Sequence, residues 1–383
     1  MVSRRALLTT GAASVVIAGL GGTWWATTGP ATSARAPWRS ASAGLGDPRL
    51  NALAYAILAP NPHNMQPWRI QLEEGLRFTV FADLARLLPE TDPPDRQITI
   101  GFGCFLELCR QAANESGYRA DIAYFPEGEP QPRLDQRPIA TVELVEDRSV
   151  QTDPLFATAL GRRTSRFEYD LSRPVEASVL RQLEAASVDG VRVATTAEAG
   201  LVHELKTLCS DAWQVEWSNK ATRQESIEVM HVGRAAVEDR PYGIALDDRI
   251  NSTLGKAGMV SPEALDDPES MAYQESFKFY DKACRSASAF VWSTTETNSR
   301  SAQLDAGRAW VRVQLAANAA GLSFHPLSQA LQEFPEMAEP YRRAHELLAN
   351  EDGQTVQMLA RLGYGPAVGA SPRERLESKL VEV

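Results

Sequence analysis

The sequence predicts an α+β fold in which two tandem lobes pair within one chain as an intramolecular pseudo-dimer. Two observations lead to this prediction. Short runs that alternate apolar and polar residues, as antiparallel strands do, stand beside longer runs with helical periodicity. In addition, a group of residues recurs at a constant offset of 204 positions, which indicates one structural unit used twice. A chain of 383 residues is long enough to bury cores of that size.

The first lobe shows these patterns most clearly. The pair Glu74-Gly75 separates two alternating runs, which is typical of a hairpin. A later segment places its apolar side chains on one helical stripe and ends at Gly117, which suits a helix C-cap. The predicted elements are a helix at Arg49–Leu58, a hairpin of Arg69–Glu73 with Leu76–Asp83, a helix at Gly101–Ser116, and strands at Arg119–Phe125 and Ala140–Val145.

The repeat relates the helix Gly101–Ser116 to a second alanine-rich segment in the other half of the chain. Alanine-rich helices share residues by accident, which is the alternative explanation, but the capping glycine recurs in register as well. Two copies of one unit would pack about a pseudo-two-fold axis, where small helix faces allow a close approach. The matched pairs are Gly103/Gly307, Ala112/Ala316, Ala113/Ala317, Asn114/Asn318, Gly117/Gly321 and Arg96/Arg300.

These patterns predict the following division of the chain. A signal or anchor occupies residues 1–34, a small and flexible linker 35–46, the first lobe 47–150, and the second lobe 151–383 with a helical insertion at about 205–280. The insertion, Leu205–Tyr280, is rich in aromatic residues and reads as helices joined by a loop around Pro241–Asp248.

The N-terminus carries the pattern of an export signal. Arg4-Arg5 is followed by Ala-Leu-Leu, and no further charge occurs until Arg35. This predicts export by the twin-arginine route to the periplasm or cell envelope, with a candidate cleavage site at Ala34-Arg35-Ala36. The alternative is an uncleaved membrane anchor, because the uncharged run is long enough to span a bilayer.

Charge and cysteine content exclude some function classes. The formal net charge is −10, which argues against a nucleic-acid partner, since phosphate backbones bind basic surfaces. The four cysteines contain no Cys-x-x-Cys pair and are expected to be buried free thiols. The five histidines form no ligand cluster, so no metal site is predicted.

The most unusual stretch is Ala59–Trp68, which reads Ala-Pro-Asn-Pro-His-Asn-Met-Gln-Pro-Trp. Its three prolines fix φ repeatedly and remove three backbone donors, so the segment is predicted to be a rigid loop. Asn64 and Gln66 each offer donors and acceptors, which suits the edge of a flat polar ligand. The alternative is an ordinary surface turn pinned by Trp68 in the core.

A basic cluster precedes the predicted helix Glu176–Ala186. Arg162, Arg163, Thr164 and Arg166 place three guanidiniums and a hydroxyl within five residues. Arginine forks match phosphate oxygens bidentately, and amides at a helix N-terminus would add to the attraction. On composition alone a solvated basic patch is the alternative.

Together these segments resemble the nitroreductase family, whose members bind FMN. Pro60, Asn64 and Gln66-Pro67-Trp68 resemble its Pro-Ser-x-x-Asn-x-Gln-Pro-Trp loop, with Asn61 in place of serine. The cluster Arg162–Arg166 resembles its Arg-Arg-Ser-x-Arg segment, with Thr164 for serine. From about Asp47 to Leu380 the chain is most similar to the Acg branch, in which two lobes are fused.

The resemblance implies a role for each matched residue. Arg162 and Thr164 would hold the FMN phosphate, and Arg166 would lie at the N1/O2 edge of the flavin, where a cation raises the reduction potential. Leu322–Gln329 resembles the segment whose backbone approaches the flavin, and Arg373 and Arg375 resemble a C-terminal basic pair that returns to the phosphate. The implied cofactor-binding residues are Pro60, Asn61, His63, Asn64, Gln66, Arg162, Arg163, Thr164, Arg166, Pro326, Leu327, Ser328, Arg373 and Arg375.

The resemblance also implies a function, with alternatives. The first hypothesis is an FMN oxidoreductase that passes hydride from a donor such as NAD(P)H to a small electron-poor acceptor, with no catalytic acid or base required. The second is a protein that sequesters FMN under a lid formed by the insertion, which could equally be added scaffold. A third is a remnant of a flavin site in a structural domain. The oligomeric state is expected to be a monomer, as pseudo-dimer, or a homodimer.

Overall fold

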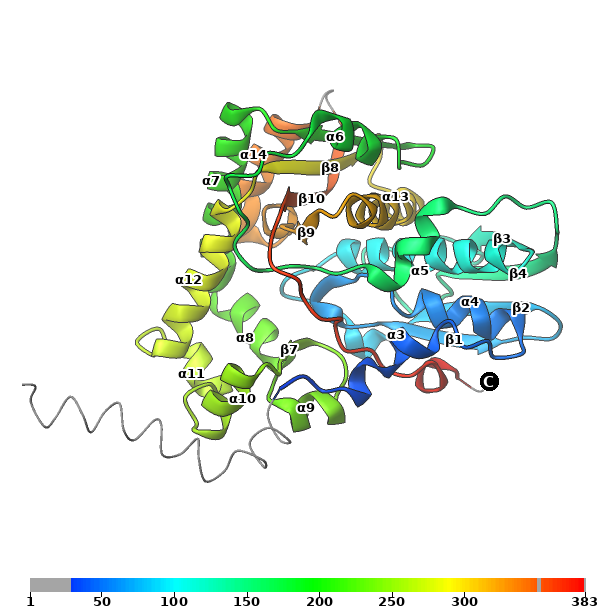
Figure 1. The fold of residues 1–383 in the computed structure, drawn as a ribbon, viewed down its shortest axis with the longest axis horizontal. Helices are drawn as coiled ribbons and strands as arrows, with labels where there is room; N and C mark the ends of the chain where they lie inside the picture. Colours follow the sequence, from blue (N-terminus) through cyan, green and yellow to red (C-terminus); the bar gives the residue numbers. More distant parts are fainter. Residues whose placement is uncertain (1–28, 350–352, 382–383) are drawn as a thin grey trace, which may run out of the picture.

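The computed structural model describes residues 29–349 and 353–381 (Figure 1). The predicted twin-arginine signal lies almost entirely outside this part of the chain. The predicted α+β class is confirmed, since two four-stranded antiparallel sheets pack with helices on either side of a central helix pair. The helices are α3 (Ala36–Ser40), α4 (Pro48–Ala56), α5 (Arg96–Glu115), α6 (Ala177–Glu184), α7 (Ala199–Ser218), α8 (Lys220–Glu228), α9 (Arg234–Asp239), α10 (Arg249–Lys256), α11 (Pro262–Asp266), α12 (Met271–Arg285), α13 (Arg300–Ala319) and α14 (Ala338–Leu348).

Each sheet is a separate layer with its own central helix. The first sheet has the order β1-β2-β4-β3 and the second has the order β5-β8-β10-β9. Helix α5 packs on the first sheet and α13 on the second. The strands are β1 (Trp68–Leu72), β2 (Arg77–Ala82), β3 (Tyr118–Tyr124), β4 (Ala140–Glu146), β5 (Val191–Thr196), β8 (Ala289–Thr295), β9 (Ser323–Pro326) and β10 (Thr355–Gly363).

The strand registers follow from the pattern of buried side chains. Ile70 pairs with Val80, and Val80 pairs in turn with Ala140. All three side chains are buried against α5, as the alternation in sequence predicts. In the second sheet β10 is buried along its whole length and pairs with both β8 and β9. Its sequence, Thr-Val-Gln-Met-Leu-Ala-Arg-Leu-Gly, includes the buried polar residues Gln357 and Arg361, so neither alternation nor a continuous apolar run marks its ends.

Helix α5 begins five residues before the predicted start at Gly101. Its first free amides are capped from outside the helix, because the Asp92 carboxylate accepts hydrogen bonds from the N–H groups of Gln97 (3.0 Å) and Ile98 (2.9 Å). Capping by a residue several positions upstream leaves no adjacent sequence signal. The predicted end is confirmed, since Gly117 follows the helix with φ +79°.

Helices α5 and α13 touch through glycine. A Cβ atom at Gly103 would lie 2.0 Å from the carbonyl oxygen of Leu304, and one at Gly307 would lie 2.0 Å from that of Ile100. The Cys104 thiol donates a hydrogen bond of 3.1 Å to the Gly307 carbonyl across the same contact. The predicted close approach of the two small helix faces is therefore confirmed.

The predicted flexible linker at 35–46 is wrong for its first half. Residues 33–40 form a 3-10 turn followed by helix α3, with Ala34 and Trp38 almost fully buried. Small residues alone suggested flexibility, whereas burial of one tryptophan and of small side chains against distant segments orders the chain here. The candidate cleavage site Ala34-Arg35-Ala36 lies inside this packed segment.

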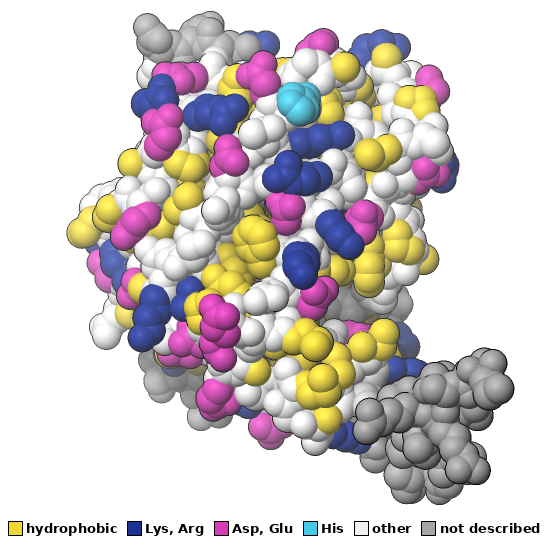
Figure 2. Space-filling model, turned by 90° about the vertical axis from the view of Figure 1, so that its left-hand side faces the viewer, with side chains coloured by type: hydrophobic (Ala, Val, Ile, Leu, Met, Phe, Trp, Pro, Cys, Tyr) yellow, Lys and Arg dark blue, Asp and Glu magenta, His cyan; other side chains and the backbone are white. Residues whose placement is uncertain are grey.

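The insertion forms a layer of its own along the left side of Figure 1. It is helical as predicted, but the loop expected around Pro241–Asp248 contains strand β7 (Ile244–Leu246), which pairs in parallel with β6 (Met230–Val232). A pairing between two three-residue strands carries too weak a sequence pattern to predict. Figure 2 shows the outer face of this layer, where acidic and basic side chains are intermixed and no continuous basic area is visible.

The four cysteines are buried free thiols, as predicted. Within the described residues, every helix is too short or too polar to cross a bilayer. The domain boundaries and the export route remain predictions.

Candidate functional site

The loop between α4 and β1 holds three non-glycine residues in the left-handed region of backbone conformation. His63, Asn64 and Gln66 adopt positive φ values of 48°, 59° and 51°. The Asn61 side chain braces this shape, because its Oδ1 accepts a hydrogen bond from the Gln66 N–H (2.8 Å) and its Nδ2 donates to the Ala59 carbonyl (3.0 Å). Asparagine supplies such local turns readily, so Asn61 suits this position as well as the serine of the related motif.

The amides of Asn64 and Gln66 bind the protein itself. Asn64 Nδ2 donates to the carbonyls of Gly243 (3.2 Å) and Pro372 (3.1 Å). Gln66, which is fully buried, donates from Nε2 to the Pro241 carbonyl (3.0 Å) and accepts from the Glu374 N–H (2.9 Å). These side chains therefore fasten the insertion and the C-terminal tail to the loop, which the sequence did not indicate.

Two arginines from distant segments meet at one carbonyl oxygen. Arg162 Nη2 and Arg373 Nη2 both donate to the Leu58 carbonyl at 3.0 Å. Arg162 also donates to Gln314 Oε1 on α13 (3.2 Å), and Arg373 Nη1 donates to Asn64 Oδ1. The loop, the Arg-rich segment and the C-terminal tail are thus brought together, as the resemblance implied.

No carboxylate neutralises these cations. Within the described residues, neither Arg162, Arg163 nor Arg373 forms an ion pair with Asp or Glu. Arg162 and Arg373 are 3% and 2% exposed, and the Nε–H of each is buried without an acceptor. Burial lowers the pKa of Arg162 to about 10, and burial together with Arg162 and Arg163 lowers the pKa of Arg373 strongly. Buried cations of one sign with unused donors are a candidate binding site for an anion. We call Arg162, Arg163 and Arg373 the arginine site.

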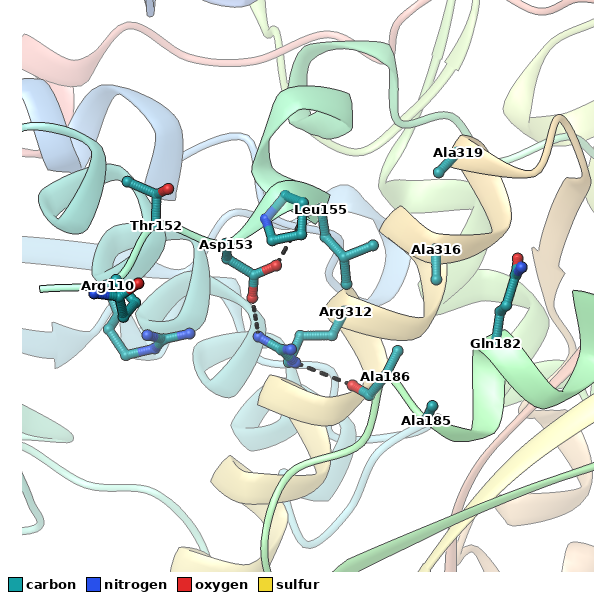
Figure 3. Close-up of a pocket in the computed structure, with 12 residues that line it drawn as sticks. Arg110, Thr152, Asp153, Leu155, Gln182, Ala185, Ala186, Arg312, Ala316 and Ala319 are labelled. Carbon is teal, nitrogen blue, oxygen red and sulfur yellow. Dashed lines mark hydrogen bonds and ion pairs between the residues drawn. The ribbon is translucent and has the colours of Figure 1, made fainter.

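A second arginine group in the same protein shows the contrasting arrangement. The buried carboxylate of Glu107 binds Arg110 (2.6 Å), Arg308 (3.3 Å) and Arg312 (3.0 Å), and Asp153 also binds Arg312. Of these residues, Arg110, Asp153 and Arg312 border a groove of about 590 Å³ between α13, α6 and the segment 151–155 (Figure 3). Because its arginines already hold carboxylates, this groove is not an anion site.

Two further residues of the basic segment, Arg163 and Thr164, lie near Arg162. The fourth residue, Arg166, does not. Arg163 Nη1 donates to the carbonyls of Leu160 (2.9 Å) and Arg162 (2.7 Å). Thr164 Oγ1 accepts from Gln314 Nε2 (3.4 Å), so Gln314 contacts both Arg162 and Thr164. Arg375 is exposed, and within the described residues its side chain forms no hydrogen bond or ion pair with the arginine site.

Arg166 occupies a different position from its neighbours. It is exposed, and no described residue forms a hydrogen bond or ion pair with its guanidinium. Its charge acts on groups of three elements. Burial and, to a smaller extent, Arg166 lower the pKa of His63 to about 4. Burial, with Arg361 and Arg166, lowers the pKa of His325 strongly, and burial raises the pKa of Tyr280. Both histidines are therefore neutral at physiological pH. The cations of this area are exposed Arg166 and buried Arg361, whose Nε donates to His325 Nδ1 (3.0 Å).

Polar contacts from the insertion close the area around Arg166. His63 Nε2 lies 3.0 Å from Ser226 Oγ of α8. The ring of His325 lies 5.3 Å from that of Tyr280, and Tyr280 accepts a hydrogen bond of 2.8 Å from Gln329. Loop, insertion and second sheet therefore converge at Arg166.

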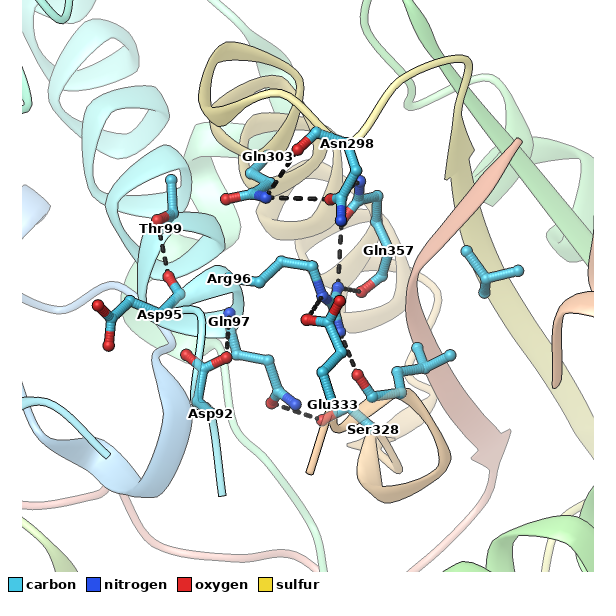
Figure 4. A network of polar contacts seen from close by, with 12 residues as sticks. Asp92, Asp95, Arg96, Gln97, Thr99, Asn298, Gln303, Ser328, Glu333 and Gln357 are labelled. Atoms are coloured by element: carbon cyan, nitrogen blue, oxygen red, sulfur yellow. Dashed lines mark hydrogen bonds and ion pairs between the residues drawn. The ribbon is translucent and has the colours of Figure 1, made fainter. Parts of the chain in front are cut away.

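The segment Pro326–Ser328 follows β9 and is held by a polar network (Figure 4). The Leu327 N–H donates to the Leu359 carbonyl (2.9 Å), and Ser328 Oγ donates to Gln97 Oε1 (3.0 Å). Fully buried Arg96 joins the same network, with Nη1 on the Gln357 carbonyl (2.8 Å) and Nε on the Glu333 carboxylate (3.1 Å). The start of α5 thus fixes the segment that the resemblance assigns to the flavin edge.

Sequence reasoning missed Trp38 and Gln314. The indole of Trp38 lies 5.3 Å from Arg162, 5.0 Å from Arg163 and 5.3 Å from Arg373. A tryptophan within a predicted linker was the available signal. Gln314 gave none, because a polar residue on a helix is usually solvated.

The insertion contributes a buried carboxyl group that sequence reasoning also missed. Glu216 of α7 is 5% exposed and contacts the side chains of Gln329 and Gln332. Burial raises its pKa to about 7. Because the folded state holds this proton more tightly than the unfolded state does, the stabilising effect is complete below about pH 4.5 and is lost as the pH rises to about 7.

We expect Glu216→Gln to raise the free energy of unfolding by about 1–3 kcal/mol at pH 8 and to change it little at pH 4.5. Urea titrations at both pH values measure the difference. Glu204→Gln, at an exposed position of the same helix, is the matched control and should have no pH-dependent effect. An equal effect of Glu216→Gln at both pH values would contradict the prediction.

Among the described residues, no group of three or more His, Cys, Asp or Glu side chains could hold a metal ion.

Comparison with known proteins gives distant relatives. No protein-family model matches the chain. It is 26% identical over 322 residues to a Mycobacterium tuberculosis protein named "Putative NAD(P)H nitroreductase", which covers 84% of this chain and 86% of the relative. An uncharacterized protein of that organism is 35% identical over 125 residues, 31% of this chain and about a third (35%) of the relative. The nitroreductase named acg is 36% identical over 76 residues, 20% of this chain and 23% of the relative. The chain is therefore a distant homologue of mycobacterial nitroreductase-like proteins over most of its length.

Solved structures give a partial likeness. A nitroreductase with bound FMN from Bacteroides fragilis matches with a TM-score of 0.33 and 16% identity, over 58% of this chain and 94% of that one. The FMN-dependent nitroreductase NfnB from Mycobacterium smegmatis, in complex with NADPH, matches with a TM-score of 0.33 and 18% identity, over 57% of this chain and 92% of that one.

Proposed function

We propose that this chain is an FMN-binding oxidoreductase of the nitroreductase type, which transfers hydride from NAD(P)H to a small electron-poor acceptor. The distant homology over most of the chain supports the reaction class. The observation that carries the proposal is the arginine site, where two buried arginines share one carbonyl oxygen, lack a carboxylate and leave their Nε–H groups unused. A phosphate monoester supplies the missing acceptors and charge.

The residues present fit FMN at both of its ends. Arg162 and Arg373 would bind the phosphate, with Thr164 beside them, while Arg166 and the segment Pro326–Ser328 would border the ring. Bound FMN supplies the hydride chemistry. The protein supplies binding, orientation and the charge of Arg166, and the neutral His63 leaves that charge uncompensated. No side chain is required as acid or base.

We further propose that the two lobes arose from one duplicated unit and form an intramolecular pseudo-dimer. Helices α5 (Arg96–Glu115) and α13 (Arg300–Ala319) have the same length and keep the offset of 204 at both ends. Their contact is reciprocal, because Gly103 meets Leu304 while Gly307 meets Ile100, and each residue pair keeps that offset. Reciprocal contacts of this kind characterise an isologous interface. Because both lobes belong to one chain, their pairing does not depend on the protein concentration.

The alternative is a protein that sequesters FMN without turnover. Contacts between insertion and loop favour it, because Asn64, Gln66 and His63 all bind insertion residues. Release of a ligand would require these contacts to open. Export by the twin-arginine route also remains a proposal, and it suits a protein that folds around its cofactor before transport.

The visible spectrum of the purified protein tests FMN binding. We expect flavin absorbance and one FMN per chain after denaturation and chromatography. Anaerobic NADPH should bleach the flavin, and a nitroaromatic or quinone should restore the colour. Bleaching by dithionite but not by NAD(P)H would favour sequestration. A colourless protein that does not bind added FMN would refute both the oxidoreductase and the sequestration proposals.

Arg166 should tune the flavin potential. We expect Arg166→Gln to lower the reduction potential by about 20–40 mV, because a nearby cation stabilises the negative charge of the reduced ring. The lower figure allows for solvent screening at an exposed side chain. Equilibration with reference dyes measures the shift. An unchanged potential in a variant with normal FMN content would place Arg166 away from the ring.

A further inference from the structure

The segment of residues 31–41, which we call the N-terminal strap, is fastened to two distant parts of the protein. At its start, the Ala31 N–H donates to Asp247 Oδ2 (2.7 Å). Arg35 forms a bidentate pair with the same carboxylate, with Nη1–Oδ2 at 2.7 Å and Nη2–Oδ1 at 3.0 Å. Arg35 Nε also donates to the Ala370 carbonyl (2.6 Å). One arginine therefore links the strap to both the insertion and the C-terminal tail.

The other end of the strap lies on the arginine site. The Arg373 N–H donates to the Ala34 carbonyl (2.7 Å), and Trp38 Nε1 donates to the Ser371 carbonyl (2.8 Å). Trp38 is 6% exposed. Its ring lies within about 6 Å of all three guanidiniums, the distance at which a cation is attracted to an aromatic face.

This arrangement has a consequence for any anion bound at the site. Trp38 is an apolar wall that keeps water from buried Arg162 and Arg373 and from half-buried Arg163, and it offers no hydrogen-bond acceptor to them. Charge-assisted hydrogen bonds strengthen when water is excluded. An anion held there is released once the wall moves and water reaches the guanidiniums.

We propose that the N-terminal strap is a gate for the arginine site. Trp38 covers the three guanidiniums, and the Arg35–Asp247 pair keeps the strap closed. The strap therefore sets how fast a phosphomonoester leaves the site. The identity of that ligand as FMN rests on the proposed function, whereas the gate itself requires only an anion. Trp38 is a positioning residue in this scheme. The candidate cleavage site Ala34-Arg35-Ala36 lies within the gate, so the proposal requires a protein that is not cut there.

The test compares FMN, riboflavin and inorganic phosphate on the full chain. Release of FMN is followed by the recovery of flavin fluorescence after dilution, and phosphate binding by the shift in unfolding temperature. Riboflavin lacks the phosphate and reports any general damage to the ring site. The variants are Trp38→Ala, Trp38→Phe and Asp247→Asn, and Arg39→Ala is the matched control, because Arg39 is exposed on the same helix α3.

We expect Trp38→Ala and Asp247→Asn to release FMN at least about tenfold faster and to lose most of the phosphate-induced shift, with riboflavin affinity unchanged. Trp38→Phe, which keeps the ring but loses the bond to Ser371, should lie between Trp38→Ala and the unmodified protein. If Trp38→Ala does not fold, Trp38→Phe and Asp247→Asn decide the question.

The outcomes separate the two proposals. Phosphate binding that depends on Trp38, in a protein that ignores FMN, would support the gate and refute the flavin assignment. Normal FMN binding with unchanged release rates in all strap variants would refute the gate and leave the flavin assignment standing. If the unmodified protein binds neither FMN nor phosphate, the site takes no such anion, and both proposals are overturned.

Discussion

Replacing Gly103 by alanine is expected to destabilise the protein by more than about 4 kcal/mol, because the added methyl group collides with backbone. The new Cβ would lie 2.0 Å from the Leu304 carbonyl oxygen and 2.9 Å from the Gly307 Cα. No rotamer change relieves a clash with main chain, so α5 and α13 would have to separate. Both helices are buried along most of their length, and separation would open the core between the two sheets.

Soluble yield and thermal unfolding measure this effect. Gly307→Ala makes the reciprocal clash with Ile100 and should be as damaging. Gly369→Ala is the matched control, since its Cβ would meet nothing within 4 Å and its φ is not positive. A Gly103→Ala protein with nearly unchanged unfolding temperature would mean that the helices can move apart at little cost, and the central packing described above would then be wrong.

The second large effect concerns the arginine site. We expect Arg162→Ala to weaken FMN binding by about 10- to 150-fold, because one charge-assisted contact contributes about 1.5–3 kcal/mol. Riboflavin, which has no phosphate, should bind the variant as well as it binds the unmodified protein. The fold should persist, since Leu58 keeps its bond from Arg373. Fluorescence titration with both ligands measures the ratio of affinities.

Arg375→Ala provides the control for this experiment. The resemblance assigns Arg375 to the phosphate together with Arg373, but its side chain is exposed and away from the arginine site in the described structure. We therefore expect less than about a twofold change in FMN affinity. A loss at Arg375 comparable to that at Arg162, or unchanged FMN retention in Arg162→Ala, would contradict the assigned phosphate site.

The elements that the sequence predicted well are those whose signals are local. Alternation located the hairpin of β1 and β2, a stripe with a capping glycine located most of α5, and three prolines located the rigid loop. Motif resemblance selected Arg162 and the loop before any geometry was known. These predictions agree with the structure because each signal depends on residues that are close together in the sequence.

Other features depend on contacts between distant segments, which leave no local signal in the sequence. Residues 35–40 resembled a linker, yet Trp38 and Ala34 are buried against the C-terminal tail. Arg375 matched a motif as well as Arg373 did, and only the path of the tail places one inside and the other in solvent. The side-chain amides of Asn64 and Gln66 bind backbone of the insertion and the tail, contacts that the sequence did not indicate.

By itself, the sequence determined the kind of residues available: a stiff loop, a basic segment, a repeated glycine-bearing helix and an α+β pattern. Only the tertiary structure decided which arginines lack a carboxylate and which are already neutralised. A guanidinium carries its charge wherever it lies, so the sequence alone shows that charge. Whether a carboxylate lies beside it depends on the path of distant segments, which only the tertiary structure shows. Glu107 and Asp153 form ion pairs with Arg312, whereas no described acid pairs with Arg162 or Arg373 and their Nε–H groups lack acceptors, which is why we propose the anion site at the latter pair.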